Sequence, residues 1–144
     1  KDKIIWCPFD KEDSQFVKVL KDNGFKVIYS HLETGQDFLT YEPENWDVMI
    51  SNPPYKNKRV YWERALDLKK PFALLLPINI LSDSIINTTM REREREFQLL
   101  IPSRRMRFYN NLTGETGKQP TFKAAYFGVN FFEENIILVD MNIK

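Results

Sequence analysis

The chain has 144 residues, 42% hydrophobic and 14% aromatic, which is enough for one compact core and too short for two sizeable domains, so we expect a single domain over residues 1–144. No apolar run approaches the roughly 20 residues of a membrane span and no signal peptide is evident, so we expect a cytoplasmic protein with no membrane partner. The net charge of +1 gives no global sign of nucleic-acid binding, and the single cysteine, Cys7, excludes an internal disulfide and a multi-cysteine zinc site, so no metal is expected.

The first part of the chain predicts a strand, a helix and a second strand. Residues 4–6 form a short apolar run that ends at Cys7 and Pro8. A helix capped by Asp13 or Ser14 follows, and residues 25–29 form the next apolar run. Such a unit favours two parallel strands joined by the helix. The helix places Phe16, Val17 and Leu20 on one face and ends at Asn23 and Gly24.

The middle of the chain continues this alternation. Residues 47–51 and 72–76 are apolar enough for buried strands, and residues 60–68 have helical spacing with Trp62, Ala65 and Leu66 inward. Alternating strands and helices indicate the α/β class. A further helix is expected over residues 84–100, with Ile86, Met90, Phe97 and Leu100 on one face. Its charged residues 91–96 alternate in sign, which favours a solvated face over a binding patch.

The last part of the chain predicts strands that close the sheet. They cover residues 106–109, 122–131 and 136–140, and the last two form an antiparallel hairpin around a tight Glu-Glu-Asn turn. The resulting sheet is mostly parallel with a C-terminal antiparallel hairpin. Residues 110–120 form a long polar loop that contains glycine, and such loops in compact domains tend to be functional or disordered.

The strand of residues 47–51 runs directly into Asn52, Pro53, Pro54 and Tyr55. Two prolines in a row cannot continue a sheet ladder, so they fix a short extended loop and leave carbonyl groups free to accept hydrogen bonds. The Asn52 side-chain oxygen and the Pro53 carbonyl can each accept one hydrogen of an exocyclic amine, while Tyr55 stacks on the ring that carries it. Adenine fits this description. The alternative is a rigid turn that only ends the strand.

With this loop, the chain resembles the N6-adenine-specific methyltransferases, the Asn-Pro-Pro-Tyr amino-methyltransferases that use S-adenosylmethionine. The likeness extends upstream to residues 35–39 and downstream to residues 72–77, 101–108 and 120–128, so it covers nearly the whole chain. A small phage-like or prophage-like member matches the length. The resemblance implies a Rossmann-like S-adenosylmethionine-dependent methyltransferase fold. It also implies methyl transfer to the N6 amino group of adenine in nucleic acid, with DNA favoured over RNA because similar small enzymes mostly modify DNA.

The resemblance assigns roles residue by residue. The catalytic residues would be Asn52, Pro53, Pro54 and Tyr55. Asp37 would accept a hydrogen bond from the adenine amino group of the cofactor with Phe38 beside that ring, and Cys7, Pro8, Phe9 and Asn52 would complete the cofactor site. The substrate-binding residues would be Tyr55, Lys56, Lys58, Arg105, Lys118 and Phe122.

Basic residues support the nucleic-acid interpretation, although a solvated lysine-rich surface explains them equally well. Arg59 and Arg64 follow Lys56 and Lys58 after the loop, and together they could neutralise phosphates on either side of a flipped base. Sequence selection would come from residues 110–120, from the aromatic hairpin of residues 120–131 or from a partner subunit, or it would be loose. A homodimer is also a possible assembly. A second cluster lies late in the chain at Arg104, Arg105, Arg107, Lys118 and Lys123.

The first loop departs from the family. Family members carry two glycines after Asp-Pro-Phe, whereas this chain has Cys7 in place of the acid and Lys11 and Asp13 in place of glycines. The family's helix and loop that complete the methionine pocket would lie before Lys1. These departures keep open a catalytically inactive nucleic-acid-binding or adenine-binding protein on the same scaffold. A domain for another nucleotide is disfavoured because the chain has no glycine-rich phosphate loop.

Three residues also have simpler interpretations. Asp37 could be a turn carboxylate that caps the loop before Phe38, rather than a cofactor ligand. His31, the only histidine, suits a loop position better than a catalytic role. Cys7 is better explained as a packed thiol than as a nucleophile.

Overall fold

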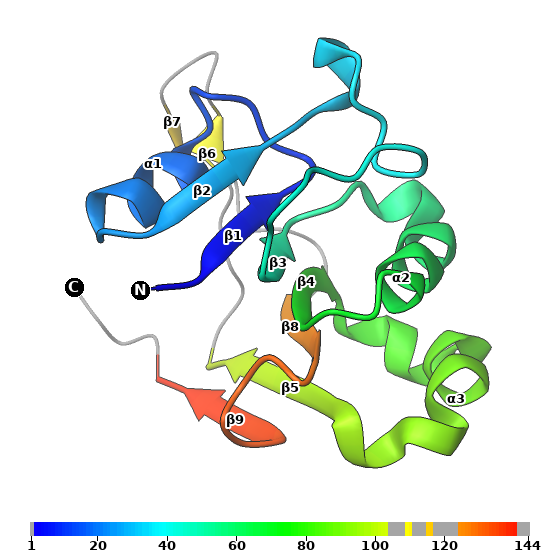
Figure 1. The fold of residues 1–144 in the computed structure, drawn as a ribbon. Coiled ribbons are helices and arrows are strands. Elements are labelled where there is room, and N and C mark those ends of the chain that lie inside the picture. Colours follow the sequence, from blue (N-terminus) through cyan, green and yellow to red (C-terminus); the bar gives the residue numbers. More distant parts are fainter. Residues whose placement is uncertain (1, 104–108, 111–114, 117–123, 141–144) are drawn as a thin grey trace.

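The computed structural model describes residues 2–103, 109–110, 115–116 and 124–140 of the chain (Figure 1). Strands and helices alternate in the first half: β1 (Ile4–Cys7), α1 (Gln15–Asp22), β2 (Lys26–Tyr29), β3 (Val48–Ser51), α2 (Lys58–Asp67) and β4 (Phe72–Pro77). The second half contains α3 (Ser84–Met90), β5 (Phe97–Pro102), β6 (Tyr109–Asn110), β7 (Glu115–Thr116), β8 (Ala124–Val129) and β9 (Ile136–Val139). Short 3₁₀ helices lie at η1 (Leu32–Thr34), η2 (Tyr55–Asn57), η3 (Ile78–Ser82) and η4 (Arg91–Glu96).

Seven of the strands form one sheet in the order β2-β1-β3-β4-β8-β5-β9. Neighbouring strands run parallel from β2 to β4 and again between β5 and β9. β8 is antiparallel to both of its neighbours, β4 and β5. The short strands β6 and β7 pair with each other apart from this sheet. The predicted α/β class and mostly parallel sheet are confirmed.

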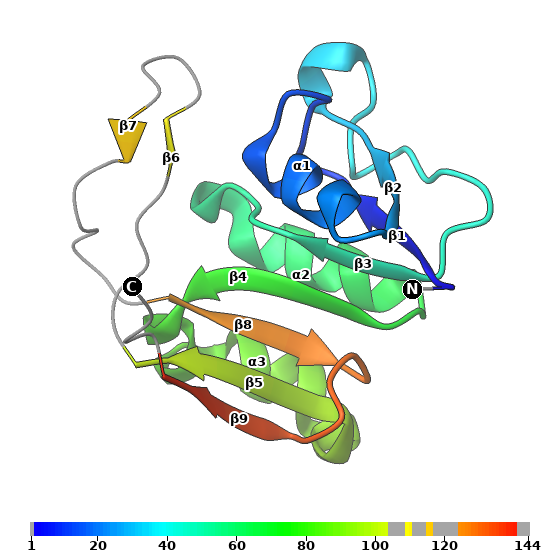
Figure 2. The same ribbon diagram turned by 90° about the vertical axis from the view of Figure 1, so that its left-hand side faces the viewer.

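Helices cover both faces of this sheet. α1 lies against one face, over β1 and β2, while α2 and α3 lie behind the other face (Figure 2). Among the described residues, no helix combines the length and the apolar character that crossing a membrane requires.

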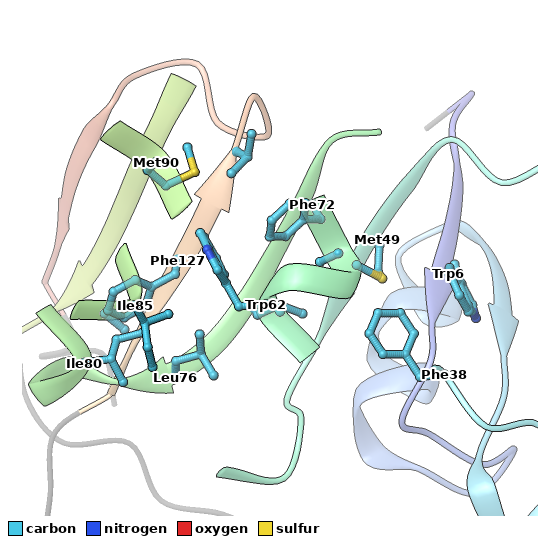
Figure 3. Packing of buried hydrophobic residues seen from close by; sticks show 14 of the residues in the cluster. Trp6, Phe38, Met49, Trp62, Phe72, Leu76, Ile80, Ile85, Met90 and Phe127 are labelled. Carbon is cyan, nitrogen blue, oxygen red and sulfur yellow. The ribbon is translucent and has the colours of Figure 1, made fainter. Parts of the chain in front are cut away.

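The larger hydrophobic core lies between the sheet and the two helices α2 and α3. Trp62 from α2 is fully buried and packs edge-on against Phe72 of β4 and Phe127 of β8, at ring-centroid distances of 5.1 Å and 6.5 Å (Figure 3). Every residue of β4 is buried, as expected for a strand covered on both faces. The core therefore holds β3 and β4 rigidly, and the loops after these strands are anchored by it.

The predicted elements of the first half are confirmed within two residues. Ser14 precedes α1, and Asn23 follows it with Gly24 at φ +88°, a left-handed conformation that suits glycine at a helix end. The Ser14 side chain makes no cap hydrogen bond and turns elsewhere. In α2, Trp62 and Ala65 are buried as predicted.

The helix predicted over residues 84–100 is wrong in its second half. α3 ends at Met90, and the charged residues 91–96 form η4, where Arg93 departs from helical geometry at φ −130°. Phe97 and Leu100 belong to the strand β5. In a strand, successive side chains point to opposite faces of the sheet, and the sequence of β5 suits this alternation. Phe97, Leu99 and Ile101 reach the core, whereas buried Gln98 accepts hydrogen bonds from the backbone N–H groups of Phe131 and Phe132, each at 2.7 Å.

The predicted C-terminal hairpin is also wrong. β8 and β9 lie where strands were expected, but β5 separates them in the sheet. Residues 130–135 carry the chain past the amino-terminal end of β5, and the Gln98 contacts to Phe131 and Phe132 hold this connection in place. Most of the expected strand 106–109 and of the loop 110–120 lies outside the described residues.

Candidate functional site

The site expected from the sequence lies where the strand order reverses. From β1 the chain first passes to β2 on one side and later returns to β3 on the other side of β1. In open α/β sheets this reversal leaves a crevice at the carboxyl ends of the two strands, and ligands bind there. The crevice expected here would lie between the loop after Cys7 and the loop after Ser51, which are joined by the hydrogen bond from the Ser51 hydroxyl to Asp10.

The loop after β3 exposes its first residue on a fixed backbone. Asn52 and Pro54 are exposed, whereas the Pro53 side chain is buried and anchors the loop. Pro54 has the extended angles φ −60° and ψ 138°, and Tyr55 begins η2, which leads directly into α2. An open hollow of about 300 Å³ is lined by Asn52, Pro53, Pro54 and Tyr55.

Tyr55 is only partly available to a ligand. It is half-buried and packs against the larger core. Burial, with a smaller contribution from Tyr126, raises the pKa of Tyr55 to about 12, so the phenol stays neutral at physiological pH. The ring can therefore offer a partial, uncharged surface beside Asn52.

The loop after β1 is held by a carboxylate that sequence reasoning missed. Asp10 accepts hydrogen bonds from the hydroxyl groups of Ser14 at 2.7 Å and Ser51 at 3.2 Å, and its backbone N–H donates to the Ser30 carbonyl at 2.9 Å. Asp10 thus links the ends of β1, β2 and β3. Burial raises its pKa, while the two serine hydroxyls and His31 act in the opposite direction. The only sequence signal for the role of Asp10 was its position directly after Pro8 and Phe9.

Tyr126 of β8 belongs to the same polar cluster and was also missed. Burial, with smaller contributions from the charges of Asp10 and Cys7, raises the pKa of Tyr126 to about 12. No local pattern in the strand of residues 124–129 distinguishes this tyrosine from a core residue, because its neighbours come from distant parts of the chain.

The predicted cofactor residues of the first loop are mostly buried. Cys7 is fully buried, and burial together with Asp10 raises the pKa of its thiol, so it is a packed, protonated group. Pro8 is buried as well. Phe9 is half-buried, and its ring lies 5.1 Å from that of Phe38 and 5.0 Å from that of Tyr61.

Asp37 and Phe38 lie in a tight turn. Asp37 Oδ1 accepts a hydrogen bond from the Leu39 N–H at 3.0 Å, which is the capping interaction expected of a turn carboxylate. Within the described part of the chain, no hydrogen bond reaches the other carboxylate oxygen, Oδ2, so it can still accept one from a ligand. Phe38 is 2% exposed, and its ring lies 5.5 Å from Trp6 (Figure 3).

His31 and Glu33 occupy the end of β2. The His31 Nδ1 accepts a hydrogen bond from the Glu33 backbone N–H at 3.0 Å and so caps η1. The Glu33 carboxylate lies 2.7 Å from the Lys11 ammonium, which lowers the pKa of Glu33. Lys11 is therefore drawn toward this turn. A hollow of about 760 Å³ lies beside it, lined by Lys11, Glu12, Asp13, Lys18, Lys21, Tyr29, Thr34 and Gln36.

The basic residues after the loop divide into two groups. Lys56 is exposed and Lys58 half-buried at the start of α2. Arg59 instead donates to the hydroxyls of Ser84 and Thr88, and Arg64 donates to backbone carbonyls. Arg59 and Arg64 thus have partners within the protein, and contact of the basic residues with phosphates stays a prediction. Arg105, Lys118, Phe122 and the remaining late basic residues lie outside the described residues.

Comparison with known proteins gives little further guidance. No protein-family model matches the chain, and no curated protein matches it. The chain is similar to the crystal structure of Thermoplasma acidophilum 1320, with a TM-score of 0.40, 10% sequence identity, and coverage of 92% of this chain and 80% of that one. A TM-score this low does not establish a shared fold or function. What the structure defines is a mixed α/β protein in which the loops after β1 and β3 lie at the reversal of the strand order.

Proposed function

We propose that this protein is an S-adenosylmethionine-dependent methyltransferase with a Rossmann-like fold, acting on the N6 amino group of adenine in nucleic acid, and on DNA rather than RNA. One observation carries the proposal: Asn52 is exposed on a proline-fixed loop at the carboxyl end of β3, at the switch point of the sheet. This is where a ligand of such a sheet is expected. The residues present there are those that an adenine amino group requires.

The loop would activate the amino group by holding its hydrogens. The lone pair of that nitrogen is delocalised into the ring, which makes it a poor nucleophile. The Asn52 side-chain oxygen and the Pro53 carbonyl would each accept one hydrogen and so favour a pyramidal nitrogen whose lone pair is available for attack. This catalysis depends on position and electrostatics, and the proton leaves to solvent after the new N–C bond has formed.

The adenine end of S-adenosylmethionine would lie at Asp37. Asp37 keeps one carboxylate oxygen for an amino group while the other fixes its turn. Phe9, with the Cys7 and Pro8 backbone, would border the crevice toward the reacting atoms. When bound, S-adenosylmethionine would supply an electrophilic methyl group, whose bond to sulfur breaks as the N–C bond forms, and would leave as S-adenosylhomocysteine. Phe38 would support this site from within the core and would not lie against the cofactor, since it is almost fully buried.

Nucleic acid would be held beside the loop by Lys56 and Lys58. Both lie within three residues of Tyr55, and an extruded adenine at Asn52 leaves phosphates on either side of it. The half-buried Tyr55 would replace part of the stacking that the base loses. Long-range attraction would be weak because the net charge is only +1.

The first loop favours a second candidate, an adenine-binding or nucleic-acid-binding protein without catalysis. Glycines are replaced by Lys11 and Asp13, and Lys11 is drawn to Glu33. The hollow beside Asn52 shares no lining residue with the larger hollow beside Lys11. A protein of this kind would keep the Asn52 loop and have lost methyl transfer.

The test is a transfer assay with labelled S-adenosylmethionine and unmethylated DNA or RNA in parallel. The polymer is digested to nucleosides and searched for the N6-methylated adenine nucleoside by mass spectrometry. The proposal expects this product from DNA, and the Asn87→Ala variant on the outer face of α3 should match the wild type. Binding of DNA or RNA, with neither S-adenosylmethionine binding nor methylated adenine in either polymer, would support the second candidate.

A further inference from the structure

Arg64 of α2 is bound in an unusual way. Its Nε donates to the Phe38 carbonyl at 2.9 Å and its Nη2 to the Tyr41 carbonyl at 3.3 Å. The guanidinium also lies over the Phe38 ring, 5.8 Å from its centroid. Within the described part of the chain no carboxylate pairs with Arg64. A charged side chain is thus committed to the backbone of a single loop.

The two carbonyls belong to the turn that begins at Asp37. The Asp37 backbone carbonyl accepts from the N–H groups of Thr40 and Tyr41, and its Oδ1 accepts from that of Leu39. These bonds close the inside of the turn. The Phe38 and Tyr41 carbonyls accept hydrogen bonds from outside the turn, from the Arg64 guanidinium. The planar guanidinium spans both carbonyls, which a lysine ammonium cannot do with the same geometry. Arg64 therefore fixes the shape of the turn that orients the Asp37 carboxylate.

The same helix reaches the other two loops of the site. α2 begins directly after η2, which starts at Tyr55 of the catalytic loop. Its Tyr61 packs edge-on against Phe9 of the first loop, and lies 6.2 Å from Phe38. α2 thus follows the loop after β3 and contacts both the loop after β1 and the Asp37 turn, to which Arg64 is hydrogen-bonded.

We infer that Arg64 is a positioning residue that sets selectivity for an aminopurine over an oxopurine, by holding Asp37 so that Oδ2 accepts from a purine amino group. This inference rests on the proposed function. An oxopurine presents an oxygen where the aminopurine presents a donor, so a fixed carboxylate disfavours it strongly. A carboxylate on a loosened turn can move away and discriminates less.

The probes are S-adenosylhomocysteine and S-inosylhomocysteine, which differ at this purine position. Calorimetry should show that the wild type prefers the adenosyl compound by about tenfold or more. Arg64→Lys should bring this preference to within about threefold, because it keeps the charge but cannot span both carbonyls. The matched control, Arg59→Lys, changes an arginine of the same helix that contacts Ser84 and Thr88, and it should keep the wild-type preference.

Amide hydrogen exchange provides a readout that does not need a ligand. Leu39 and Tyr41 should exchange faster in Arg64→Lys and in Arg64→Gln, while amides of β4 stay protected, which shows that the fold is intact. A wild-type preference in Arg64→Lys, or unchanged exchange at Leu39 and Tyr41, would overturn the inference alone. Failure of the wild type to bind either compound would overturn the proposed function and this inference with it.

Discussion

The loops after β3 and after β1 border one crevice but are held in different ways. The first is shaped by its own covalent structure, because Pro53 and Pro54 fix the backbone and Pro53 is buried. The second is shaped by distant partners, because Asp10 must reach Ser14, Ser51 and the Ser30 carbonyl. One half of the proposed site is therefore rigid because of its own sequence, whereas the other half depends on the folded sheet around it.

The largest expected effect is at the rigid loop. Asn52→Ala removes the side-chain acceptor for the target amine and should lower methyl transfer by about 100-fold or more. Binding of S-adenosylmethionine should change little, because that end of the crevice is formed by other residues. The measurement compares turnover and cofactor affinity in the same preparation. Transfer within about threefold of the wild type would contradict the role of Asn52.

The next effect concerns the Asp37 turn. Asp37→Asn keeps an oxygen that can accept from the Leu39 N–H but offers an amide donor in place of Oδ2. Its preference should therefore reverse, so that S-inosylhomocysteine binds at least as well as S-adenosylhomocysteine. Calorimetry with both compounds checks this. An unchanged preference for the adenosyl compound would show that Asp37 does not read the purine.

The loop after β1 should respond in stability. Asp10→Ala leaves the part-buried hydroxyls of Ser14 and Ser51 without their acceptor and should lower the free energy of unfolding by about 1–3 kcal/mol. Urea denaturation followed by tryptophan fluorescence measures this. Asp13→Ala, an exposed acid of the same loop, serves as the control and should be nearly neutral. An equal decrease in the free energy of unfolding in both variants would contradict the role of Asp10 in holding this loop.

The charge of Asp10 adds a pH dependence. Burial raises its folded-state pKa, so the native chain holds a proton that the unfolded chain releases. Relative to Asp10→Asn, the wild type should be most stable below the ordinary aspartate pKa of about 3.9 and should lose this advantage as pH rises through the folded-state value. Urea denaturation of both proteins from acid to neutral pH gives the difference. If the stability of the wild type relative to Asp10→Asn increased with pH, the predicted direction would be wrong.

The smallest effect returns to the proline loop. Pro54→Ala frees a residue whose φ of −60° alanine can also adopt, so it should cost about 0.4–1 kcal/mol of stability through the unfolded state. Transfer should fall by a few fold because the loop is less rigid. Pro43→Ala in the connection before β3 is the control, and it should leave transfer unchanged. Equal transfer in both variants would indicate that the loop needs no proline at residue 54.

These differences also explain how much could be predicted from the sequence. Residues 52–55 and the strands and helices up to β4 follow local patterns, and the structure places them where those patterns indicate. Asp10, Tyr126 and Arg64 act through partners far along the chain, which no local pattern reveals. The apolar spacing of residues 84–100 suits a helix. In the structure residues 97–102 instead form a strand, because they pair with both β8 and β9 in the sheet.

The central claim is most directly tested by calorimetric titration of the chain with S-adenosylmethionine, alongside Asp37→Ala. We expect micromolar binding by the wild type that is lost in the variant, because the variant lacks the carboxylate proposed to receive the adenine amino group. Asp67→Ala, an exposed acid at the end of α2, should bind like the wild type. No detectable binding by the wild type, or equal binding by Asp37→Ala, would contradict the account.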